Sequence, residues 1–228
     1  EVLMTPEGEW KVRRMDFDEF IQLCRAVEAE PIVVACYDAL FTPGCTVTKE
    51  RLIETAAAWV EYANKKKGYG VTYWEIGNEG YIDPTVDPRD YARDLIDFAT
   101  AMKSVDPSIK IAANGPPRAD GSGRHEGTKH LPWWKILYET ASDHIDLIAI
   151  HSYSCWEWGS YETYRDHGPG YPEASRDALC PIEAARKYGS PDLADRLRLA
   201  VTETNAADWS EGGWPKVNDL GHGLVAFD

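Results

Sequence analysis

Two glutamates, Glu79 and Glu203, have the side-chain type and the placement that acid–base chemistry requires in this 228-residue chain. Glu79 follows the apolar run of residues 71–76 and a Gly-Asn pair, and Glu203 follows the apolar run of residues 197–202. Each carboxylate therefore comes at the carboxyl end of a predicted strand. Two such carboxylates can cleave a glycosidic bond, because one protonates the leaving oxygen while the other compensates the positive charge on the sugar. Taken singly, either could be a structural carboxylate that bonds a helix start or an arginine.

Five short apolar runs supply the strands that would position these residues. The runs, whose length is typical of buried parallel strands, are residues 31–36, 71–76, 109–113, 145–150 and 197–202. The predicted helices between them cover residues 16–28, 49–66, 88–105 and 133–141. Thr48 is placed to cap the second helix, and Pro88 is a favoured first-turn residue of the third. A long loop is expected from His151 to about Cys180.

Strands that alternate with helices predict a parallel α/β architecture. The expected fold class is a (β/α)8 TIM-barrel type, whose active site is built at the carboxyl ends of the strands, in one partial domain over residues 1–228. A full barrel needs about 250 residues, and a sequence lacking the first two strands and the last would explain the five that are recognisable. The start of the chain is loop-like, and residues 217–228 read as a helix. A doubly wound sheet is the alternative, although no Gly-rich phosphate turn follows an early strand.

Three segments carry a resemblance to a known family. They are FDEFIQLCRAVEAEPIVV (17–34), WVEYANKKKGYGVTYWEIGNE (59–79) and YARDLIDFATAMKSVDPSIKIAANG (91–115). In this order they resemble the α-L-arabinofuranosidase-like members of the retaining glycoside hydrolases with barrel folds, in which Trp-Glu-Ile-Gly-Asn-Glu is typical. The resemblance implies that the five runs are barrel strands three to seven. It also implies that Glu79 is the acid/base and Glu203 the nucleophile of a double-displacement mechanism.

In a retaining enzyme the two carboxyl groups lie only about 5 Å apart. We expect the pKa of Glu79 to be raised by its charged partner, so that it enters the cycle protonated. Glu203 is expected to stay ionised and to attack the sugar. Glu79 would then switch to a base and activate water.

Further sugar-binding residues are implied by the same resemblance or by position after a strand. They are Asn78, His151, Tyr153, Asn114, Tyr37, Trp156 and Trp209. Asn78 is expected to hydrogen-bond the 2-hydroxyl of the sugar, and Tyr153 either to donate to Glu203 or to pack on Trp156. Tyr37 ends strand three, where arabinofuranosidases usually have an asparagine, so arabinose specificity stays open. The loop tryptophans would form sugar subsites or simply pack their own loops.

Charge and motifs narrow the class of partner. With 24 basic and 38 acidic residues, the net charge of −14 disfavours nucleic acid and anionic membranes, whereas a neutral carbohydrate substrate would not be repelled. A retaining O-glycosidase is expected to act without a metal or an organic cofactor. His125 and His130 do not form a metalloprotease motif, because their spacing is one residue too long to place both on one helix face. The cellular compartment stays open between secreted and cytoplasmic, with secreted slightly favoured.

Two rival functions remain. A non-catalytic carbohydrate-binding or scaffold protein could derive from a truncated barrel, and its open barrel edges would favour self-association. A metal-dependent hydrolase that uses Glu79 with His151 is the other rival.

Overall fold

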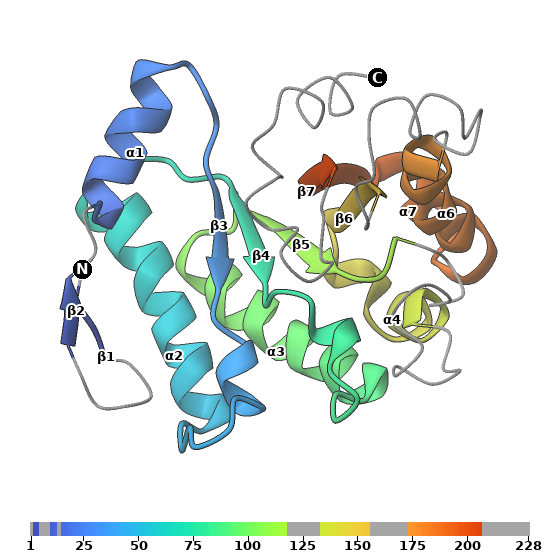
Figure 1. The fold of residues 1–228 in the computed structure, drawn as a ribbon, viewed down its shortest axis with the longest axis horizontal. Helices are drawn as coiled ribbons and strands as arrows, with labels where there is room; N and C mark the ends of the chain where they lie inside the picture. Colours follow the sequence, from blue (N-terminus) through green and yellow to red (C-terminus); the bar gives the residue numbers. More distant parts are fainter. Residues whose placement is uncertain (1, 5–9, 13–14, 118–132, 156–172, 207–228) are drawn as a thin grey trace. The chain divides into compact units, whose positions relative to one another are not determined.

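A computed structural model describes residues 2–4, 10–12, 15–117, 133–155 and 173–206 of the chain (Figure 1). Its main sheet has the strand order β3-β4-β5-β6-β7, so neighbours in the sheet are also consecutive in the sequence. The strands are β3 (Ile32–Ala35), β4 (Tyr73–Ile76), β5 (Lys110–Asn114), β6 (Leu147–Cys155) and β7 (Arg198–Ala206). The pairs β3–β4 and β6–β7 are parallel. The five predicted strands are therefore confirmed.

Helices separate these strands, as predicted. They are α1 (Phe17–Ala26), α2 (Lys49–Val60), α3 (Pro88–Val105), α4 (Trp133–Ala141), α6 (Glu173–Tyr188) and α7 (Leu193–Arg196). Short helical turns are η1 (Asp38–Leu40), η3 (Gly80–Ile82) and η5 (Ser142–His144), and the last turns of the second predicted helix form a π-helix, η2 (Glu61–Lys66). The Thr48 hydroxyl caps α2 by accepting from the Arg51 N–H.

Two sequence predictions are wrong. The start of the chain is not wholly loop-like, because β1 (Val2–Met4) pairs antiparallel with β2 (Trp10–Val12). The loop predicted from His151 to Cys180 is too long, because β6 continues to Cys155 and α6 begins at Glu173. Polar and aromatic residues after Ile150 suggested a loop, whereas pairing with β7 keeps this stretch extended. The helix predicted over residues 217–228 lies outside the described residues.

The described chain divides into two compact units. The first comprises residues 1–78 and 94–112, and its core holds fully buried residues such as Val60 and Trp74. The Trp74 indole N–H donates to the Val71 carbonyl. The second comprises residues 79–93 and 113–228. In its core the indoles of Trp133 and Trp134 donate to the carbonyls of Asn114 and Pro116. Satisfying each buried indole N–H in this way avoids the cost of an unpaired polar group.

Among the described residues, no helix combines the length and the apolar character that crossing a membrane requires.

Candidate active site

Glu79 projects from an unusual turn at the end of β4. The strand stops at Ile76, and both Gly77 (φ 74°) and Glu79 (φ 52°) then adopt left-handed backbone conformations. The 3-10 helix η3 follows at once, with the Ile82 N–H donating to the Glu79 carbonyl (2.8 Å). A left-handed conformation costs a non-glycine residue about 1–2 kcal/mol. Such strain persists only where the surroundings impose it, and it is common at functional sites.

Glu203 reaches the site by a different backbone feature, a β-bulge in β7. Ile150 of β6 pairs with Val201, but the next residue, His151, pairs with Glu203, so Thr202 is an extra residue in β7. A bulge of this kind redirects the side chains that follow it. As a result Glu203, rather than Thr202, lies beside His151.

His151 joins the two carboxylates, all within the second unit. Its Nδ1 lies 2.7 Å from Glu79 Oε1 and 3.4 Å from Glu203 Oε2. One carboxylate oxygen of Glu79, one carboxylate oxygen of Glu203 and one ring nitrogen of His151 all lie within 4.8 Å of one another. The His151 side chain is 4% exposed, whereas those of Glu79 and Glu203 are 33% and 40% exposed. The structure therefore brings together three predicted site residues, with two solvent-accessible carboxylates over a buried imidazole.

Asn114 ends β5 in the second unit and is 1% exposed. Its backbone is held on both sides, because its N–H donates to the Tyr91 hydroxyl (3.0 Å) and its carbonyl accepts from the Trp133 indole (3.1 Å). Tyr91 and Trp133 also pack their rings together at 5.0 Å. Asn114 thus lies in the buried aromatic core next to the strand end, and its contact with sugar stays a prediction.

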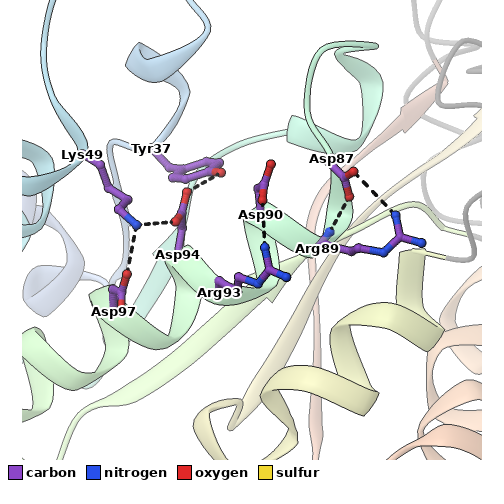
Figure 2. Close-up of polar contacts among 8 residues, drawn as sticks. All are labelled: Tyr37, Lys49, Asp87, Arg89, Asp90, Arg93, Asp94 and Asp97. Atoms are coloured by element: carbon purple, nitrogen blue, oxygen red, sulfur yellow. Dashed lines mark hydrogen bonds and ion pairs between the residues drawn. The ribbon is translucent and has the colours of Figure 1, made fainter.

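Tyr37 lies in the buried core of the first unit. It is 3% exposed, and within the first unit its hydroxyl donates to Asp94 of α3 (3.1 Å) (Figure 2). Its ring packs edge-on against Phe98 (6.0 Å). Tyr37 is therefore part of the packing of the first unit, and its contact with sugar stays a prediction. Cys36, which precedes it, is exposed.

The structure describes only some of the remaining predicted residues. Asn78 is exposed, and its backbone N–H donates to both carboxylate oxygens of Asp38 (2.9 and 3.1 Å). The backbone of Tyr153 pairs with Asn205 in the sheet, but its side chain lies outside the described part, as do Trp156 and Trp209. Sequence reasoning missed Asp38, although an aspartate two residues after a predicted strand was the available signal.

Comparison with known proteins identifies the family. Residues 4–168 match the family model described as the alpha-L-arabinofuranosidase 1 domain. The chain belongs to this family. It is 27% identical over 173 residues to alpha-L-arabinofuranosidase C of Emericella nidulans, covering 65% of this chain and 32% of that protein. It is 31% identical over 125 residues to intracellular exo-alpha-(1->5)-L-arabinofuranosidase 1 of Bacillus subtilis, covering 45% and 23%. The chain thus matches a third or less of the length of these relatives.

Solved structures agree with the family assignment at the level of the fold. The GH51 alpha-L-arabinofuranosidase of Thermotoga petrophila RKU-1 superposes with a TM-score of 0.63 at 23% identity, covering 99% of this chain and 45% of that one. The alpha-L-arabinofuranosidase of Thermotoga maritima gives a TM-score of 0.60 at 22% identity, covering 90% and 41%. The predicted fold class, an incomplete (β/α)8 TIM-barrel type, is confirmed.

Proposed function

We propose that this arabinofuranosidase-family domain is a retaining glycoside hydrolase that cleaves O-glycosidic bonds in polysaccharides or oligosaccharides. The observation that carries the proposal is the short separation of the carboxylates, since oxygens of Glu79 and Glu203 lie within 4.8 Å of each other. Retaining enzymes place their carboxyl groups about 5–5.5 Å apart, whereas inverting enzymes leave about 6.5–9.5 Å for a water molecule. The geometry favours direct attack on the sugar.

The two carboxylates then have distinct roles. Glu79, which ends the family's Trp-Glu-Ile-Gly-Asn-Glu motif, gives its proton to the glycosidic oxygen as the bond to the sugar breaks. An oxygen of Glu203 bonds to the anomeric carbon and forms a glycosyl-enzyme intermediate. Water then attacks the same carbon, gives a proton to Glu79 and releases Glu203. Glu203 lies beyond residues 4–168, so its role rests on its position beside Glu79.

His151 orients both carboxylates in this scheme. With its proton on Nδ1, the imidazole donates to Glu79 Oε1 at 2.7 Å and faces Glu203 Oε2 at 3.4 Å. The ring is buried and therefore fixed in place, so each carboxylate is held by a rigid group at the base of the site. Fixing catalytic groups in a reactive geometry is itself a large contribution to rate.

The first substrates to test are α-L-arabinofuranosides, because the relatives of Emericella nidulans and Bacillus subtilis are named for that activity. Tyr37 follows strand β3 at a position where arabinofuranosidases usually have an asparagine, so a panel should also include β-xylosides, β-glucans and uronic acid glycosides. A neutral sugar suits the negative net charge of the chain.

The test combines a stereochemical readout with matched glutamate variants. Proton NMR of the first product formed from a nitrophenyl glycoside should show the same anomeric configuration as the substrate. Glu203→Ala should lose activity by at least about 10³-fold. Glu79→Ala should lose about 10²- to 10⁴-fold. Glu54→Ala, which removes an exposed glutamate of α2, should leave activity unchanged.

Each rival function has its own outcome in this test. An inverted product would contradict the retaining mechanism. Saturable sugar binding without turnover would favour a non-catalytic carbohydrate-binding protein. Activity abolished by a chelator and restored by a divalent metal would favour a metal-dependent hydrolase, because the oxygen and nitrogen atoms of Glu79, His151 and Glu203 are a suitable ligand set.

A further inference from the structure

We propose that Asp38 and Tyr37 are positioning residues that hold the turn from which Glu79 projects. The inference rests on the proposed acid/base role of Glu79, and it gives a function to two residues that follow β3.

Two successive backbone N–H groups of the turn donate hydrogen bonds to residues at or just after the end of β3. The Gly77 N–H donates to the Ala35 carbonyl (2.9 Å), which continues the pairing of the two strands by one residue. The Asn78 N–H donates to both carboxylate oxygens of Asp38 (2.9 and 3.1 Å). A charged acceptor makes the second bond stronger than an ordinary backbone bond. Asp38 thus binds the residue that precedes Glu79.

The turn also fits closely against Tyr37. A Cβ atom added at Gly77 would lie 3.0 Å from Tyr37 Cβ and 3.3 Å from an Asp38 carboxylate oxygen. Gly77 is therefore required twice, once for its left-handed φ and once for this close approach. Because there is no spare space between Gly77 and Tyr37, the position of Tyr37 sets the position of the turn.

Tyr37 is in turn fixed by a polar network shown in Figure 2. Its hydroxyl donates to Asp94 Oδ2 (3.1 Å), and Asp94 Oδ1 accepts from Lys49 Nζ (2.8 Å), which also contacts Asp97 (3.1 Å). The hydrogen bonds that Lys49 donates to Asp94 and then to Asp97 raise the pKa of Lys49 above its usual value, so the ammonium stays charged. Lys49 begins α2, and Asp94 and Asp97 belong to α3. The network therefore links the end of β3 to two helices.

These contacts explain how a strained residue can be held in place. Glu79 is one of only two non-glycine residues with positive φ among those described, and such a conformation needs support from its surroundings. Asp38 and Tyr37 supply support immediately before Glu79 in the chain. Loss of that support should relax the turn and move the Glu79 carboxyl away from the leaving oxygen.

The experiment compares two glycosides that differ in their need for acid. A dinitrophenyl leaving group departs without protonation, whereas an alkyl leaving group requires the proton of Glu79. In Asp38→Ala, kcat/KM should fall about 10- to 100-fold for the alkyl glycoside and much less for the dinitrophenyl glycoside. Asp38→Asn, which keeps a side-chain acceptor, should recover part of the loss. Tyr37→Phe, which removes only the hydroxyl, should show a smaller loss with the same leaving-group dependence.

Controls separate positioning from folding and from the proposed function. Glu54→Gln removes an exposed carboxylate of α2 that pairs with Arg51 and has no part in this network, and it should change neither substrate's kcat/KM. Hydrogen exchange of the Asn78 amide, which needs no activity, should accelerate in Asp38→Ala while the melting temperature changes little. Equal losses for both glycosides, or unchanged Asn78 exchange in an active enzyme, would overturn the inference. A wild-type protein that cleaves neither glycoside would instead refute the proposed function, and Glu79 positioning with it.

Discussion

The ends of β4 and β7 deliver their carboxylates by opposite means. At β4 the strand stops, and a left-handed turn presents Glu79 while Asp38 holds the backbone from outside. At β7 the strand continues through Glu203 to Ala206, and one extra residue redirects the side chain. The position of Glu79 depends on backbone conformation and close contacts, whereas the position of Glu203 depends on the one extra residue in β7. The two should therefore respond differently to mutation.

The largest expected effect comes from removing the extra residue of β7. Deletion of Thr202 should restore regular pairing with β6 and turn Glu203 to the other face, because side chains alternate along a strand. Activity should fall by at least about 10³-fold, as for loss of a nucleophile, when kcat/KM is measured on a nitrophenyl glycoside.

Thr202→Val is the matched control for the deletion, since it keeps both the residue count and the shape of the side chain. The Thr202 hydroxyl is buried and has no hydrogen-bond partner among the described residues, so its loss should leave activity intact and leave stability unchanged or slightly higher. Equal damage from the deletion and the substitution would show that the bulge is not what places Glu203.

His151 contacts both carboxylates, so its replacement tests a group that the two strand ends share. His151→Phe keeps a flat ring but removes the donor to Glu79 Oε1, and kcat/KM should fall about 10²-fold. His151→Asn can place an amide near the position of Nδ1 and should lose less. If both variants lose activity equally, the hydrogen bond is not the source of the effect.

Glycine substitutions test the turn at β4. Gly77 and Gly68 both have positive φ (74° and 67°), but a Cβ at Gly77 would lie 3.0 Å from Tyr37, whereas nothing lies within 4 Å of one at Gly68. Replacing Gly68 with alanine should cost about 1 kcal/mol of folding free energy, from the backbone conformation alone, and Gly77→Ala should cost more because of the added crowding against Tyr37. Only Gly77→Ala should also lower kcat/KM, by about 10-fold. Comparable activity losses in the two variants would show that crowding at Tyr37 does not control Glu79.

The contrast between the two strand ends also shows how far sequence can predict a site. Apolar runs and helix caps located the strands, so the positions of Glu79 and Glu203 at strand ends were predictable. The extra residue at Thr202 was not, because a bulge is a property of pairing with a partner strand and leaves no local signal. The burial of Tyr37 was not predictable for a related reason, since alternation no longer fixes side-chain direction once a strand has ended.

The smallest effect on activity is expected at the start of β4, far along the strand from its catalytic end. Asn64 exchanges hydrogen bonds with the backbone of Val71 (2.7 and 3.0 Å) and also donates to Asp106 (2.8 Å). Asp106 further accepts from the Ser108 hydroxyl and N–H, and these bonds, the hydroxyl first, lower its pKa below the ordinary value of 3.8. Asp106→Asn should therefore destabilise the protein by on the order of 1 kcal/mol at about pH 7.

The pH dependence of that loss has a definite sign. A carboxylate whose pKa is lowered by folding stabilises the native state above its unfolded pKa, near 3.8, and this contribution disappears as the pH falls through the lower folded value. Urea unfolding of wild type and Asp106→Asn should therefore give curves that are separated near neutrality and converge in acid. Activity per folded molecule should be unchanged, because Asp106 anchors the beginning of the strand and the turn at Gly77 sets its end. A fall in kcat/KM without a loss of stability would mean that the start of β4 also controls the position of Glu79. The turn at Gly77 would then not be the only feature of β4 that places this carboxylate, and the simple contrast with the bulge in β7 would fail.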